Sequence, residues 1–193
     1  GSGTSGVGGL VSMWAGKSTV LEGGLVSISG GVADANTGGA VSVASGEGTA
    51  KSSGTIHIRS ANSGTAGVSG LLAFSSGTAK SGNSGSVLIG TGAATAGRGG
   101  LVAISSGSGT SGVGGLVSIL SGRSTINTGG ALSIESGEGT ASSSGVISIR
   151  STNSGTAGVS GLLAFSSGTV VYGNSGSVLI GTGVSTGGRG GLV

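Results

Sequence analysis

Apolar residues alternate with small or polar residues along this chain, in runs that recur about every 15 positions. We number each repeat from the Gly-Gly or Ser-Gly pair that precedes its apolar run, so that this pair occupies places one and two. Place four is always Val, Ile or Leu, and place six is Ile, Val, Met or Phe. Side chains alternate between the two faces of a strand, so each repeat is predicted to form one strand with places four and six buried. The repeats begin at Gly8, Gly23, Gly38, Ser53, Ser69, Ser84, Gly99, Gly114, Gly129, Ser144, Ser160, Ser175 and Gly190.

Two repeats, 53–68 and 144–159, have 16 residues, whereas the other complete repeats have 15. Their starts lie 91 residues apart, which corresponds to five repeats of 15 residues and one of 16. A single repeat cannot bury its apolar residues, so stacking of repeats has to stabilise the chain. We therefore predict an all-β fold, a β-solenoid (β-helix) of about 12–13 coils, rising about 4.8 Å per coil. Residues 1–193 are expected to form one solenoid segment.

The composition excludes a conventional globular core. Among 193 residues there are 49 glycines, one Trp, one Tyr and two Phe, with no Pro and no Cys. Disorder is the alternative for a chain so rich in Gly and Ser, but a mean hydropathy of +0.42 and regularly placed Val, Ile and Leu favour an ordered repeat. Both ends fall inside a repeat without a polar cap, so we expect a longer chain or filament to continue the array.

Charged residues are few and scattered. Eight basic and five acidic side chains form no basic cluster, so no nucleic-acid partner is expected. Apolar runs such as 70–74 are too short to cross a bilayer, so no membrane span is expected. The abundant Ser and Thr permit O-linked sugars.

Two glycine-rich motifs resemble nucleotide-binding loops. G-x-G-x-x-G occurs at 1–6 and 107–112, but each copy precedes a predicted strand, whereas a dinucleotide site needs a helix there. Residues 15–18 resemble the end of a phosphate-binding loop, but Val11 stands where that motif needs its first glycine. Both are therefore interpreted as turns, and no cofactor is expected.

The ionisable residues do not combine into a catalytic or metal site. His57 is the only histidine and has neither a cysteine nor a carboxylate cluster to complete a site. Asp34 is the only aspartate, which excludes a calcium-binding solenoid with one Asp per repeat. Glu135 and Glu138 could pair as glycosidase carboxylates, but Ala44 takes the place of Glu135 in the equivalent repeat 91 residues earlier. We predict that the chain is not an enzyme and has no catalytic or metal-binding residue.

Two rows of side chains are candidate interaction surfaces. Place three points outward by the alternation, yet it is apolar in most repeats, which indicates a lateral-packing stripe. Its leucines are Leu10, Leu25, Leu71, Leu101, Leu116, Leu162 and Leu192. Place twelve is often threonine, which indicates a Thr face similar to part of the array on β-solenoid antifreeze proteins. These threonines are Thr19, Thr49, Thr95, Thr110, Thr125, Thr140 and Thr186.

The repeat G-G-x-V-x-I-x-S-G resembles the Gly/Ser/Thr-rich β-solenoid repeats of extracellular filaments, appendages and adhesins, especially algal and other protist surface arrays. This resemblance covers the whole chain and implies a structural, non-catalytic building block of an extracellular filament, sheath or cell-surface appendage. The expected partners are copies of the same chain or neighbouring solenoid chains, packed end to end and side by side. The alternative is an ice-binding or adhesive solenoid that uses the Thr face.

Overall fold

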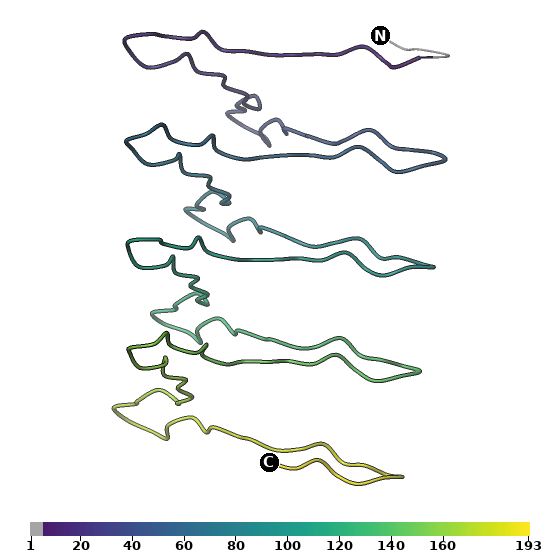
Figure 1. The fold of residues 1–193 in the computed structure, drawn as a ribbon, viewed down its shortest axis with the longest axis vertical. Helices are drawn as coiled ribbons and strands as arrows, with labels where there is room; N and C mark the ends of the chain where they lie inside the picture. Colours follow the sequence, from purple (N-terminus) through teal and green to yellow (C-terminus); the bar gives the residue numbers. More distant parts are fainter. Residues whose placement is uncertain (1–5) are drawn as a thin grey trace. The chain divides into compact units, whose positions relative to one another are not determined.

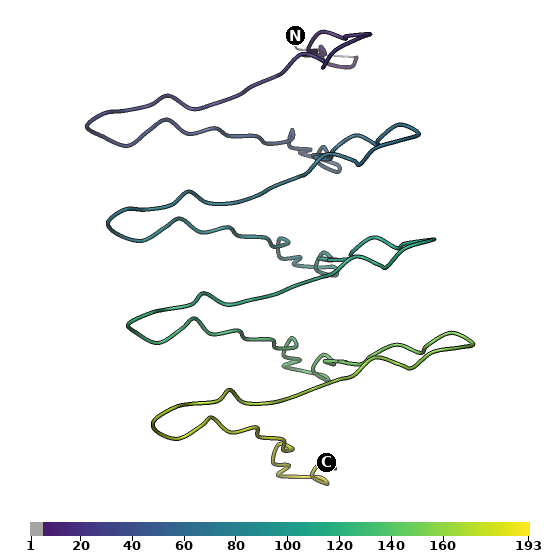
Figure 2. The same ribbon diagram turned by 90° about the vertical axis from the view of Figure 1, so that its left-hand side faces the viewer.

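The computed structural model describes residues 6–193, and these residues form no helix and no strand. The predicted all-β solenoid of 12–13 coils, and the β-helix architecture with it, is therefore wrong for this chain. The chain divides into two units, Gly1–Val102 and Ala103–Val193. Within each unit the backbone runs out and back in narrow loops (Figure 1, Figure 2).

Each complete repeat contains one sharp bend of three residues, and the bends recur at equivalent places. They occupy places twelve to fourteen, or thirteen to fifteen in the two 16-residue repeats. The bends lie at 19–21, 34–36, 49–51, 65–67, 80–82, 95–97, 110–112, 125–127, 140–142, 156–158, 171–173 and 186–188. The local backbone therefore follows the period of the sequence although it forms no sheet.

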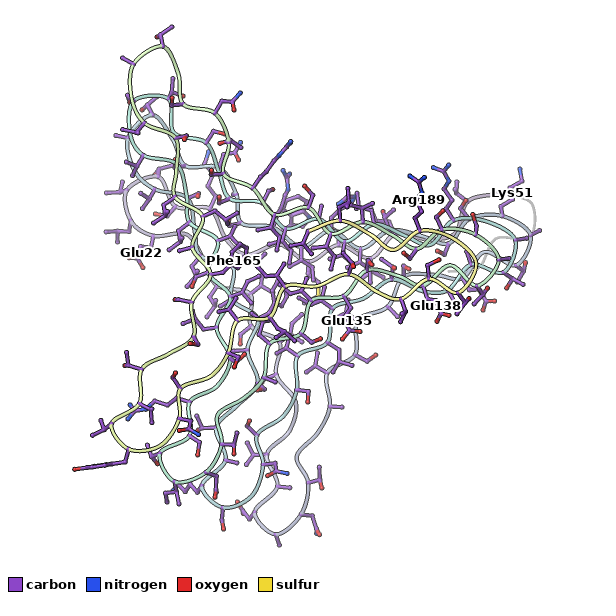
Figure 3. The ribbon with its side chains drawn as sticks, turned by 90° about the horizontal axis from the view of Figure 1, so that it is seen from below. Glu22, Lys51, Glu135, Glu138, Phe165 and Arg189 are labelled. Carbon is purple, nitrogen blue, oxygen red and sulfur yellow. The ribbon has the colours of Figure 1, made fainter. Side chains whose placement is uncertain are left out.

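Every bend is the tip of a loop that runs from place nine of one repeat to place one of the next. The two sides of the loop meet at its base, where place eight faces place two of the following repeat; we call this contact the neck. Places three to seven form a linking segment between consecutive loops. In Figure 3, Lys51 lies at an outer loop end, whereas Phe165, in a linking segment, lies far from the loop ends.

Six necks are closed by a backbone hydrogen bond. The place-two amide donates to the place-nine carbonyl oxygen eight residues earlier, over 2.8–2.9 Å. The donors are Gly24, Gly39, Gly54, Gly115, Gly130 and Gly145. At the neck of Gly115, the Ser106 hydroxyl also donates to the Gly115 carbonyl oxygen over 2.8 Å. Thr91 makes the corresponding bond to Gly100 over 3.3 Å.

Place two is glycine in every repeat, and at several necks the close approach of the backbone explains why. A Cβ added to Gly100 would lie 2.9 Å from Thr91 Cβ, and one added to Gly115 would lie 3.0 Å from Ser106 Cβ. Both distances are shorter than ordinary van der Waals contact between carbon atoms. Only a residue without a side chain lets the backbone approach place eight this closely.

Backbone hydrogen bonds occur only at the necks of the described residues, so consecutive repeats are not joined into the ladder that a solenoid needs. Within residues 6–193, no backbone–backbone hydrogen bond has its donor or acceptor in a linking segment. A folded chain of this length has on the order of a hundred backbone hydrogen bonds, against the six at the necks of the described residues. The 49 glycines raise the entropy cost of ordering the backbone. Alternation of apolar residues therefore does not by itself bring the repeats into a ladder.

The neck geometry predicts that Gly115→Ala opens its loop, because the new Cβ would meet Ser106 Cβ at 3.0 Å and Gly107 N at 3.3 Å. Losing one hydrogen bond, about 0.5–1.5 kcal/mol, should make the amide of residue 115 exchange about two- to tenfold faster. Hydrogen exchange followed by NMR measures this. In the control Gly114→Ala, the nearest atom to the added Cβ is Gly107 O at 3.9 Å, so exchange should not change. Equal acceleration in both variants would show that the close approach at place two is not what closes the neck.

Candidate functional site

The leucines of the predicted lateral-packing stripe all lie in linking segments and are open to solvent. Their exposed fractions run from 85% to 98%. They are Leu10, Leu25, Leu71, Leu101, Leu116, Leu162 and Leu192. Each linking segment in which one occurs therefore presents an uncovered branched side chain beside its place-four residue.

Places four and six are only partly covered. Place-four side chains from Val26 to Val178 are 45–56% exposed, and place-six side chains from Met13 to Ile180 are 55–75% exposed. No hydrophobic residue among 6–193 is buried. The prediction that places four and six are buried is therefore wrong. The two places are nevertheless more covered than place three, which is the order that the alternation predicts.

An apolar hollow lies between two consecutive linking segments of the first unit. It is lined by Phe74 from place six of one repeat and by Val87, Leu88 and Ile89 from the next. Phe74 is 63% exposed and Leu88 is 88% exposed, so the hollow is a shallow, open surface feature. Its lining has no charged group, and a ligand would contact it through apolar surface alone.

The threonines of the predicted Thr face lie at the loop tips. Each is the first residue of a bend and is exposed. They are Thr19, Thr49, Thr95, Thr110, Thr125, Thr140 and Thr186. The structure thus places them on separate loops, with no sheet among the described residues to hold them in one plane.

Serine at place eleven orders some of these tips. The Ser18 hydroxyl oxygen accepts a hydrogen bond from the Leu21 amide over 2.9 Å, and Ser124 accepts one from Asn127 over 2.8 Å. Ser185 does the same for Gly188 over 3.0 Å. In each case the donor is the third residue of the bend, so the hydroxyl replaces a backbone acceptor in the turn.

The motifs that resemble nucleotide-binding loops lie in these turns. Residues 107–112 run from a neck to a tip, and no helix follows them in the described chain. The other copy, 1–6, lies almost entirely outside the described residues. In 15–18, the Ser18 oxygen is occupied by the amides of its own tip. A phosphate would therefore find no helix N-terminus at either described site.

The ionisable side chains remain apart from one another. Within residues 6–193, no three His, Cys, Asp or Glu side chains come close enough to hold a metal ion. The Glu135 carboxylate accepts a hydrogen bond from the Ser133 hydroxyl over 2.7 Å. Figure 3 shows Glu138, which lies in a loop, further out than Glu135, which lies in the linking segment before that loop. His57 is exposed in a linking segment. The structure also has no helix, in the part it describes, that could cross a membrane.

Two features of the repeat were missed by the sequence interpretation. It used place two only to mark the start of a repeat, although glycine at all thirteen of these positions signals the close approach at the neck. It also assigned no role to place eleven, where serine caps the tip. Glycine at the same place has another cause: a Cβ on Gly139 would meet the carbonyl oxygen of Ser142 at 2.7 Å.

The serine caps predict that Ser124→Ala loosens its tip, because the Asn127 amide loses its acceptor. The amide order parameters of residues 125–127 should fall toward the flexible range, below about 0.6. Relaxation of ¹⁵N measured by NMR reports this change. Ser124→Thr keeps the hydroxyl and should retain the wild-type values. A tip equally ordered in the alanine variant would mean that the serine oxygen does not hold the bend.

Comparison of the chain with family models, with curated proteins and with solved structures gave no match. The exposed apolar linking segments and the polar loop tips are therefore the features on which a function can be proposed.

Proposed function

We propose that this chain is a structural, non-catalytic building block of an extracellular filament, sheath or surface appendage. The observation that carries the proposal is the accessible surface, which is 19,077 Å². A compact monomer of 17.4 kDa would expose about 7,900 Å². The chain by itself therefore leaves its apolar residues in water, and association is the route by which they become covered.

The distribution of apolar and charged residues suits association along the whole chain. The apolar positions recur in every linking segment, so a partner gains contact at each repeat instead of at one local patch. Charged residues make up only 7% of the chain, which keeps electrostatic repulsion between packed segments small. The extracellular location rests on the resemblance of the repeat to those of surface filaments and appendages.

Assembly of the purified chain tests this function. Sedimentation and negative-stain electron microscopy over a range of concentrations should show elongated particles above a critical concentration. A chain that stays monomeric and soluble at high concentration would overturn the proposal.

The leucine stripe predicts that Leu116→Ser combined with Leu162→Ser weakens assembly. Burying each leucine stabilises the assembled state by about 1.5–3 kcal/mol, so the critical concentration should rise at least about tenfold. Serine already stands at this place at Ser86 and Ser177, so the repeat accommodates it. The matched control, Val113→Ser with Val159→Ser, removes equally exposed apolar residues from loops and should change the critical concentration little. If the control raised the critical concentration more than the leucine variant did, the contact between copies would lie at the loops.

The alternative function, binding of ice or another surface, would use the exposed threonines at the tips. Ice binding needs threonines held in a rigid flat array, whereas these threonines lie on separate loops. We therefore expect no thermal hysteresis from the chain. Hysteresis that is lost in Thr110→Tyr and retained in Ser108→Tyr, a change in the same loop away from its tip, would instead support the ice-binding function.

A further inference from the structure

The linking segments need a partner that supplies hydrogen-bonding groups as well as apolar surface. Their amides and carbonyls have no backbone partner among the described residues, and their place-three leucines are almost fully exposed. Covering the side chains alone would bury unpaired backbone groups, which costs free energy. A suitable partner is therefore another backbone that presents donors, acceptors and apolar side chains at the same spacing.

The area to be covered is much larger than one ordinary interface. The chain exposes about 11,000 Å² more than a compact monomer of its mass, whereas obligate dimers bury about 2,000–5,000 Å² in total. Repeated contacts along the chain are needed to cover such an area. A partner must therefore contact many successive repeats, and its own contact sites must follow in the same order.

The bends recur in every repeat, but the hydrogen-bonded necks recur as a set only after 91 residues. The three closed necks of the first unit, at Gly24, Gly39 and Gly54, correspond to those at Gly115, Gly130 and Gly145 in the second. Each donor is displaced by 91 residues from its equivalent. The 16-residue repeats 53–68 and 144–159 are displaced by the same number.

The positive-φ glycines have the same displacement. Gly67 and Gly82 have φ of +132° and +111°, and their equivalents Gly158 and Gly173 have +137° and +111°. All four are the last residue of a bend. The other described residues have no positive φ, so a shift by one repeat matches one bend of each neighbouring pair but sets the other against a bend without this geometry.

We propose that the linking segments are covered by a second copy of this chain. The two copies are aligned either without displacement, so that each unit faces the same unit of the other copy, or with a displacement of 91 residues. This proposal rests on the proposed structural function. Only these two alignments match loop lengths, closed necks and positive-φ bends at once. If the partner were a different chain whose repeats all had 15 residues, its repeats would fall out of alignment with this chain at each 16-residue repeat. The displaced alignment leaves one unit of each copy free to bind the next copy, so assembly continues in an open filament.

Cysteine cross-linking tests the alignment, because the chain has no native cysteine. The probe positions are the third bend residues Lys51, Ser142 and Asn127. Ser142 lies 91 residues after Lys51, at the equivalent position, and Asn127 lies one repeat before Ser142. Single variants Lys51→Cys, Ser142→Cys and Asn127→Cys are mixed in pairs, assembled and treated with a short bis-maleimide.

We expect cross-links between two copies of Lys51→Cys, or between Lys51→Cys and Ser142→Cys. Their yield should be at least about fivefold above that between Lys51→Cys and Asn127→Cys, because a shift by one repeat breaks the match between copies. Equal yields for all pairs would overturn the alignment while the structural function stands. Assembled material without any cross-link would also overturn it, because the tips of paired copies would then lie apart. If no variant and no wild-type chain assembles, the structural function itself fails, and the alignment fails with it.

Discussion

The close approach at the neck is the constraint on which the local structure depends. At several necks place two passes so near the place-eight side chain that a Cβ has no room, as at Gly100 beside Thr91. This contact brings the two sides of a loop together and positions the amide of Gly115 to donate to Gly107. The loops, their tips and the threonines that they carry follow from it. The linking segments, by contrast, make no backbone hydrogen bond among the described residues.

The same arrangement leaves the linking segments incomplete. Their leucines and valines are too exposed to stabilise a monomer. Their amides and carbonyls have no backbone hydrogen-bond partner among the described residues. In an isolated small protein both conditions favour unfolding, because conformational entropy is not offset by burial. In a filament they become the means of assembly. Order in the loops is local, whereas we propose that order in the linking segments comes from other copies of the chain.

The sequence predicted the repeat but not its packing. The 15-residue spacing and the two longer repeats are readable from glycine positions and from alternation, and the bends recur with the same spacing. Burial of Val26 or Ile28 could not be deduced in the same way, because alternation states which side chains share a face and not what covers that face. The leucine stripe and the Thr face were located as exposed residues, but the caps at Ser18 and Ser124 depend on loop geometry.

We infer that the linking segments become ordered only when copies associate. Hydrogen exchange followed by mass spectrometry, on the same chain below and above its critical concentration, tests this most directly. We predict that peptides containing the linking segments exchange without protection in the dilute monomer and become protected in the assembled material. Strong protection of these peptides in a dilute, monodisperse monomer would show that the linking segments are ordered without association.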